Sequence, residues 1–252
     1  MNPFLESSNT ALALILQLEP RLLQVVGLSL AVSGSACVLA AAFGLAAGAA
    51  LAVARFRGRR ALLVLLNTLL ALPSVVVGLL VYLLLSRSGP LGSWGLLFTP
   101  TAMVLAQSVL VVPVVAALTR EALEASWEQN GEQLRSLGAG RGSAAALLLW
   151  DERMVVLTVL LAAFGRAISE VGAVMIVGGN IDGHTRVMTT AIALETSKGD
   201  LPLALALGAV LLGVVLLLNA LIALVRALGQ RSLRHAAGAA PPSVRSVEVA
   251  HG

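Results

Sequence analysis

Long apolar segments alternate with short polar ones along the whole chain. A helix needs about 20 apolar residues to cross the roughly 30 Å hydrocarbon core of a bilayer. Five segments are long enough, at residues 22–54, 61–86, 99–119, 154–180 and 201–225. A further apolar segment, residues 10–18, is too short to cross and is ended by Pro20. The pattern predicts an all-α polytopic membrane protein with about five transmembrane helices and an N-terminal interfacial helix.

Small residues and prolines interrupt these spans at defined places. In the first span Gly44 and Gly48 are four residues apart, a spacing that lets membrane helices approach closely, although glycine also simply fills such helices. The second span exceeds the bilayer core in length, so it should tilt or kink. Pro73 lies in its middle, beside the polar Ser74. A structural kink and a contact to a transported substrate are both open interpretations of these two residues.

The longest polar interruption lies near the centre of the chain, after Thr119. It is dense in charge and then in glycine, and it must lie in water, so we expect a soluble partner to contact it. A second polar loop is expected at residues 181–200, and the tail should be disordered beyond about His235. The predicted organisation is an N-terminal segment at residues 1–21, a transmembrane domain at residues 22–228 and a cytoplasmic tail at residues 229–252. The partner-binding loop, at about residues 121–153, lies inside the transmembrane domain.

Basic residues are distributed unevenly between the two sides of the predicted bundle. The connection after the first span, the central loop and the tail carry twelve arginines, against four basic residues in the other connections, namely Arg21, Arg87, Arg186 and Lys198. Arginine and lysine are enriched in cytoplasmic loops. The asymmetry predicts a plasma membrane protein with its N-terminus outside and its C-terminus in the cytoplasm.

Composition excludes several other classes of protein. The chain has 252 residues, 58% of them hydrophobic and 12% charged, far from the balance of a soluble domain. Its basic excess fits membrane topology more simply than nucleic-acid binding. Cys37 is the single cysteine, so neither an internal disulfide nor a cysteine metal cluster is expected. An intramembrane enzyme needs a nucleophile and a base at depth, but the histidines lie in loop or tail, and we expect neither a catalytic nor a metal site.

A few polar groups lie where they can act on a solute. Arg166 and Glu170 share one face of the fourth span, and ionisable groups at that depth usually face a partner or a cavity. They form either an internal or dimer-interface ion pair, or a site at which Arg166 briefly attracts an anionic solute. The outer loop offers further polar side chains, either to a solute and a second protein or only to solvent, namely Asn180, Thr185, Arg186, Thr189 and Thr190.

The central loop resembles the cytoplasmic loop of ABC importer permeases. Glu132 and Gly138 keep the spacing of that family's Glu-Ala-Ala and Gly motif, while Leu148, Trp150 and Asp151 stand where the family has Ile, Leu and Pro. The resemblance implies that an ATPase subunit docks here, on Glu132, Gly138, Ala139, Gly140 and Arg141. Glycine at 138 and 140 permits a sharp turn, and Arg141 either pairs with an acidic group of the partner or lies among lipid headgroups.

A longer match lies in residues 165–192. This segment resembles the fourth span and following loop of oxyanion permeases, closest to the tungstate type, with molybdate and sulfate permeases as relatives. The resemblance implies a type I ABC importer permease fold, a homodimer, two cytoplasmic ATPase subunits and an extracytoplasmic oxyanion-binding protein. The chain contains no Gly-x-x-x-x-Gly-Lys-[Ser/Thr] phosphate loop, so ATP is expected on the partner and no cofactor on this chain. A permease for molybdate or sulfate, and a channel or scaffold that works without ATP, remain the alternatives.

Overall fold

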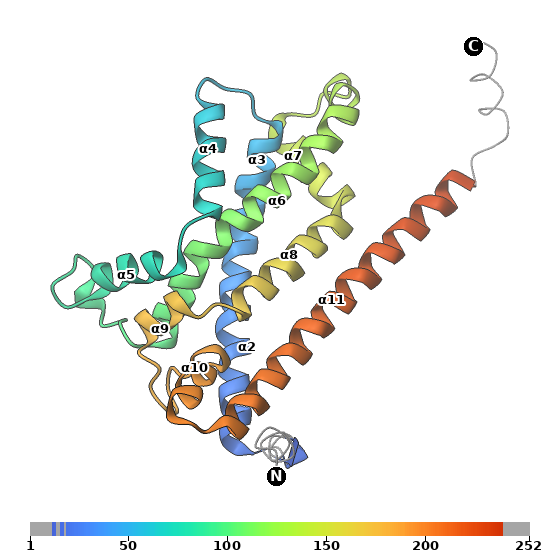
Figure 1. Cartoon of the computed structure of the whole chain (residues 1–252). Coiled ribbons are helices and arrows are strands. Elements are labelled where there is room, and N and C mark those ends of the chain that lie inside the picture. Colours follow the sequence, from blue (N-terminus) through green and yellow to red (C-terminus); the bar gives the residue numbers. More distant parts are fainter. Residues whose placement is uncertain (1–11, 14–15, 18, 239–252) are drawn as a thin grey trace.

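A computed structural model describes residues 12–13, 16–17 and 19–238 of the chain. Every regular element in those residues is a helix, and most of the helices run side by side in a bundle (Figure 1). The predicted interfacial helix at residues 10–18 lies largely outside the described residues. The predicted disordered tail lies outside them beyond Gly238.

Three long apolar elements cross the bundle. The first combines α2 (Pro20–Ala40), a π-helical turn η1 (Ala41–Leu45) and α3 (Ala46–Val53). The second is α6 (Pro100–Ser136), whose first turn is capped by the Thr99 hydroxyl. The third is α11 (Leu201–Gly238). Each is long and apolar enough to cross a membrane.

Two further spans are broken rather than continuous. Helices α4 (Arg59–Leu70) and α5 (Ser74–Leu85) meet at 98°, and α8 (Arg153–Ile168) and α9 (Gly172–Gly178) meet at 57°. Counting each bent pair as one span gives five, as the sequence predicts. The expected tilt or kink of the second span is therefore a break at Pro73, which caps α5 in an extended conformation.

The connections contain more helix than the polar pattern predicts. Helix α6 continues to Ser136, α7 (Arg141–Asp151) follows at once, and α10 (Met188–Lys198) lies in the expected outer loop. Residues 121–153 and 181–200 are therefore helical for most of their length, rather than the irregular loops that the polar pattern predicts. No proline interrupts α6 after Pro113, so its backbone hydrogen bonds continue into the polar segment. Helix α11 likewise continues past the predicted end of the fifth span to Gly238.

Helix α6 is the centre of the packing (Figure 1). It contacts α2, α3, α4, α5, α7, α8 and α9. Its tightest contact is with the first span. A Cβ atom added at Gly44 would lie 2.7 Å from Cβ of Val115, and one added at Gly48 would lie 2.6 Å from the carbonyl oxygen of Ala116. The predicted role of these two glycines in close helix approach is confirmed.

Candidate functional site

The predicted partner-binding residues lie in or beside the turn between α6 and α7, at one end of the bundle (Figure 1). Glu132 is in the last part of α6, and Arg141 begins α7. The amide of Gly138 donates to the carbonyl oxygen of Arg135 at 2.9 Å, and the amide of Ala139 donates to that of Leu134 at 3.0 Å. This pair of bonds ends a helix at a residue in the left-handed region, and Gly138 has φ +78°. The turn therefore favours glycine at 138, because other residues are strained at this φ.

The other turn residues have less special geometry. Gly140 precedes α7 with φ −67°, a value that any residue adopts, so the backbone of the turn does not depend on glycine at 140. Glu132, Gly138, Gly140 and Arg141 are exposed, and Ala139 is partly buried. All of them are accessible to a second protein at the same end of the bundle.

Helix α7 is held against α3 and α6 by a small apolar cluster. Ala144 and Leu148 of α7 are buried against Val53 of α3 and against Leu123 and Trp127 of α6. Because both flanking helices are fixed in this way, the turn between them is a rigid projection.

A second group of predicted residues lies at the break between α8 and α9. Nη1 of Arg166 lies 3.0 Å from Oε2 of Glu170. The Glu170 side chain is only 4% exposed, whereas that of Arg166 is 48% exposed. The other carboxylate oxygen of Glu170 accepts a hydrogen bond from the amide of Ala173 in the first turn of α9. Glu170 thus caps α9 while it pairs with α8, which explains why a buried carboxylate is tolerated at the break.

Two further side chains stabilise the same break from other helices. The Gln107 side chain of α6 donates to the carbonyl oxygen of Ala167 at 3.0 Å, and the Thr189 hydroxyl of α10 donates to the backbone oxygen of Glu170 at 2.7 Å. Gln107 is buried, and its Oε1 has no hydrogen-bond partner among the described residues. Sequence reasoning missed Gln107, although an amide in the middle of an apolar span was the available signal.

The break between α4 and α5 lies beside the break between α8 and α9. A Cβ atom added at Gly172 would lie 2.8 Å from Oγ of Ser74, which is partly buried, whereas Pro73 is exposed. Gly78 of α5 packs as closely on Ala173 of α9. The structure therefore brings Ser74 to the same region as Glu170, within one polar junction among apolar helices.

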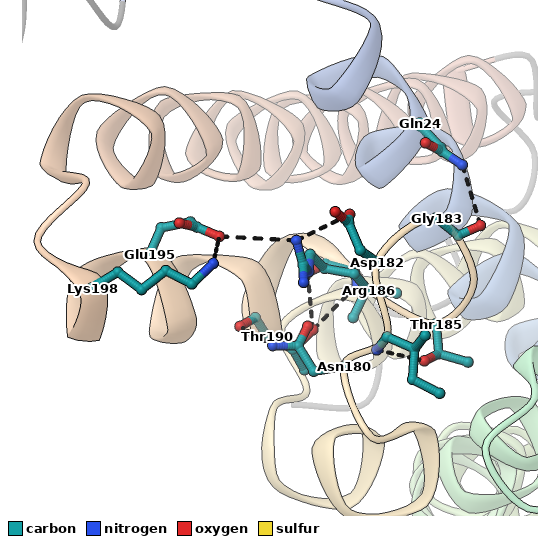
Figure 2. Close-up of polar contacts among 11 residues, drawn as sticks. Gln24, Asn180, Asp182, Gly183, Thr185, Arg186, Thr190, Glu195 and Lys198 are labelled. Carbon is teal, nitrogen blue, oxygen red and sulfur yellow. Dashed lines mark hydrogen bonds and ion pairs between the residues drawn. The ribbon is translucent and has the colours of Figure 1, made fainter.

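The third group lies in the α9–α10 connection and at the start of α10, where its side chains form a network of hydrogen bonds and ion pairs (Figure 2). The hydroxyl of Thr185 donates to the carbonyl oxygen of Gly178 and accepts from the amide of Ile181. Thr190 bonds to Val187 at the start of α10 and accepts the Asn180 side-chain amide on its carbonyl oxygen at 3.3 Å. Thr185, Thr189 and Thr190 are all buried, so the expectation that they offer hydroxyls to an anion or to solvent is wrong.

Charges around Arg186 are balanced within the same network. Its guanidinium lies 3.0 Å from the carboxylate of Asp182 and 3.9 Å from that of Glu195, which also accepts from Lys198 at 3.0 Å (Figure 2). Gln24 of α2 donates to the Gly183 carbonyl oxygen at 3.2 Å and ties the loop to the first span. The paired acidic groups make Arg186 a weak attractor of anions.

Separate alanine substitutions of Arg166 and Glu170 should each lower the melting temperature of the purified protein. Arg166→Ala leaves a buried carboxylate without its cation, which typically costs about 3–5 kcal/mol. The double variant should be less harmful than the sum of the single ones, because the two groups interact. Arg153→Ala, which removes an exposed arginine at the start of the same helix, is the control. An Arg166→Ala protein of normal stability that no longer transports its solute would contradict a structural pair.

Five apolar spans, two of them broken at a shared polar junction, describe a multi-pass integral membrane protein with an exposed turn at one end of its bundle. The family described as the binding-protein-dependent transport system inner membrane component matches residues 41–235. The chain belongs to this family, the permease subunits of ABC importers. The predicted ABC permease and its all-α fold are confirmed, and the chain is a transporter subunit and a multi-pass membrane protein.

Individual relatives extend this likeness to nearly the whole chain. A tungstate uptake system permease protein, TupB, of Peptoclostridium acidaminophilum is 42% identical over 86% of this chain and 95% of its own length. A probable anion ABC transporter permease protein of Haloferax volcanii is 43% identical over 79% of this chain and 88% of its own length. A second TupB, from Campylobacter jejuni, is 38% identical over 65% of this chain and 69% of its own length.

Proposed function

We propose that this chain forms the translocation path of an ATP-driven importer of tungstate. The observation that carries the proposal is the 42% identity with a tungstate permease across almost the full length of that relative. The similarity therefore includes the broken spans, the polar junction and the turn, rather than one motif. Molybdate is a tetrahedral dianion of nearly the same size, so a path alone separates the two poorly.

The polar junction supports transient passage rather than tight binding. Conduction requires sites that are weak enough for the solute to leave. Arg166 has an exposed guanidinium, but its charge is offset by Glu170 at 3.0 Å. An entering dianion would meet a partly neutralised cation and be released again. Tight selection of the anion then belongs to a separate extracytoplasmic binding protein.

The energy source in this proposal is a pair of cytoplasmic ATPase subunits. They would dock on the α6–α7 turn, with Gly138 at its tip and Arg141 beside it, and they would hold the ATP. Nothing in the sequence resembles a phosphate-binding loop, which supports this division of labour.

A symmetric dimer of permeases would complete the path. One chain of five spans has few helices with which to enclose a polar path. Closed two-fold symmetry is the commonest arrangement of identical subunits. Helix α11 is the least buried of the three long spans, which leaves an apolar face for a second copy or for lipid.

The test of this function is uptake of labelled tungstate into vesicles that contain the permease, its ATPase and the binding protein. Uptake should require ATP, fall with excess unlabelled tungstate, fall less with molybdate and least with sulfate. Uptake that ignores tungstate but collapses with sulfate or phosphate would assign another oxyanion and leave the permease function standing. Uptake without ATP would contradict the importer mechanism itself.

Orientation gives a separate prediction. The α3–α4 connection should face the cytoplasm and the α5–α6 connection the outside, because arginines concentrate at the first. In a Cys37→Ala background, Ser88→Cys should react with an impermeant maleimide on intact cells, whereas Arg57→Cys should react only after the membrane is opened. Both positions are exposed, so unequal burial does not confound the comparison. The reverse labelling pattern would invert the proposed topology.

A further inference from the structure

An apolar groove of about 440 Å³ lies between α3, α4 and α6. Alanines of α3 form its floor, leucines of α4 form one wall, and Pro113 of α6 lies at its base. From Ala47 to Ala54 the groove follows α3 for about 10 Å, at about 1.5 Å per residue. No side chain that lines it can hydrogen-bond, so it fits a hydrocarbon chain and offers nothing to a polar solute.

Several arginines lie beside residues of this groove in the chain, in and next to the α3–α4 connection. Phe56 lines the groove, and Arg55 and Arg57 flank it in the sequence. Arg59 is already engaged, since its guanidinium donates to the carbonyl oxygen of Leu51 and lies 2.6 Å from the carboxylate of Glu124. Arg55, Arg57 and Arg60 are exposed, and no ion pair within residues 19–227 involves them.

We propose that this groove binds an anionic phospholipid, with one acyl chain between α3 and α4 and the phosphate on Arg55, Arg57 and Arg60. Arginine forks match the geometry of phosphate oxygens, and basic pockets between spans are favourable sites for anionic headgroups. The inference does not depend on which anion is transported.

Charge also decides between lipid and a second permease copy as the occupant. A two-fold interface through this groove places the same surface on both subunits. Because the two surfaces are identical, the exposed arginines beside the groove would need acidic partners from that same surface, and the residues that line the groove include none. A phospholipid instead supplies an acyl chain for the apolar groove and a negative charge for the arginines.

The test compares lipids bound to the purified permease after delipidation and addition of phosphatidylglycerol or phosphatidylcholine with identical acyl chains. Native mass spectrometry should show preferential retention of phosphatidylglycerol, and that lipid should also raise the melting temperature more than phosphatidylcholine or inorganic phosphate does. Arg57→Gln with Arg60→Gln should reduce the preference for phosphatidylglycerol by at least about tenfold, the scale expected for two headgroup arginines.

Two matched controls separate the site from general effects. Arg21→Gln with Arg87→Gln removes the same charge from exposed positions at the opposite end and should retain the preference. Ala47→Phe fills the groove and should abolish retention, whereas Ala46→Phe, its exposed neighbour outside the groove, should not. Equal retention of both lipids, or equal effects of the two phenylalanine variants, would overturn the proposal. Conversion of a dimer to a monomer by Ala47→Phe would assign the groove to a second copy instead.

Discussion

Replacement of Gly138 by glutamate should leave the permease folded in the membrane but abolish ATP-driven uptake. An added side chain at Gly138 meets no atom within 4 Å, so its cost to the fold is mainly the strain of φ +78°, about 1–2 kcal/mol. The cost to docking is larger. A charge buried at a protein contact without a partner costs on the order of several kcal/mol. Copurification of the ATPase should therefore fall by at least about a hundredfold, given roughly 1.4 kcal/mol per factor of ten.

Gly58→Glu is the matched control for this prediction. Gly58 lies in the α3–α4 connection with φ +92°, and an added Cβ there also meets no atom within 4 Å. It therefore reproduces the strain and the charge outside the α6–α7 turn, and it should retain the ATPase. Gly138→Ala adds the strain without the charge and should weaken docking only modestly. Normal ATPase binding and uptake by Gly138→Glu would show that the turn is not the docking site.

The number of spans was predictable because length and apolar composition are properties of single segments. The breaks within two of the spans were not predictable in this way. Pro73 indicated a kink, but a right-angled turn into α5 depends on how closely Gly78 packs on Ala173 of another helix. The break after Ile168 contains no proline, and it is stabilised by contacts from Gln107 and Thr189, which lie far away in the sequence.

The polar pattern misjudged the connections for a related reason. Charge density predicts exposure to water, but it does not distinguish a loop from an exposed helix. The segment after Thr119 stays helical while its apolar positions, Leu123 and Trp127, bury against α3 and α7. Only a tertiary contact identifies that burial.

The same distinction between local and tertiary properties applies to the candidate site residues. Arg166 and Glu170 were found because four residues separate them on one helix, so their pairing is a local property. The threonines of the outer loop were assigned to the surface because threonine is polar. Their hydroxyls instead satisfy backbone groups of a tightly folded loop, such as the carbonyl oxygen of Gly178. The fold determines which backbone groups need a hydroxyl as their hydrogen-bond partner.

Substitution of Gly48 by leucine should have the largest effect on the fold itself. A Cβ atom at Gly48 would lie 2.6 Å from the carbonyl oxygen of Ala116 and 3.1 Å from the amide nitrogen of Arg120, both in the backbone of α6. Backbone in the central helix cannot move aside as a flexible side chain does, so α3 and α6 must separate. Overpacking of this kind costs about 1–3 kcal/mol or more. Gly34→Leu adds the same side chain to the same span, where an added Cβ meets nothing within 4 Å, and should be tolerated. The measurement is the yield and melting temperature of detergent-purified protein. Equal yields and melting temperatures for the two variants would show that the α3–α6 contact is looser than described.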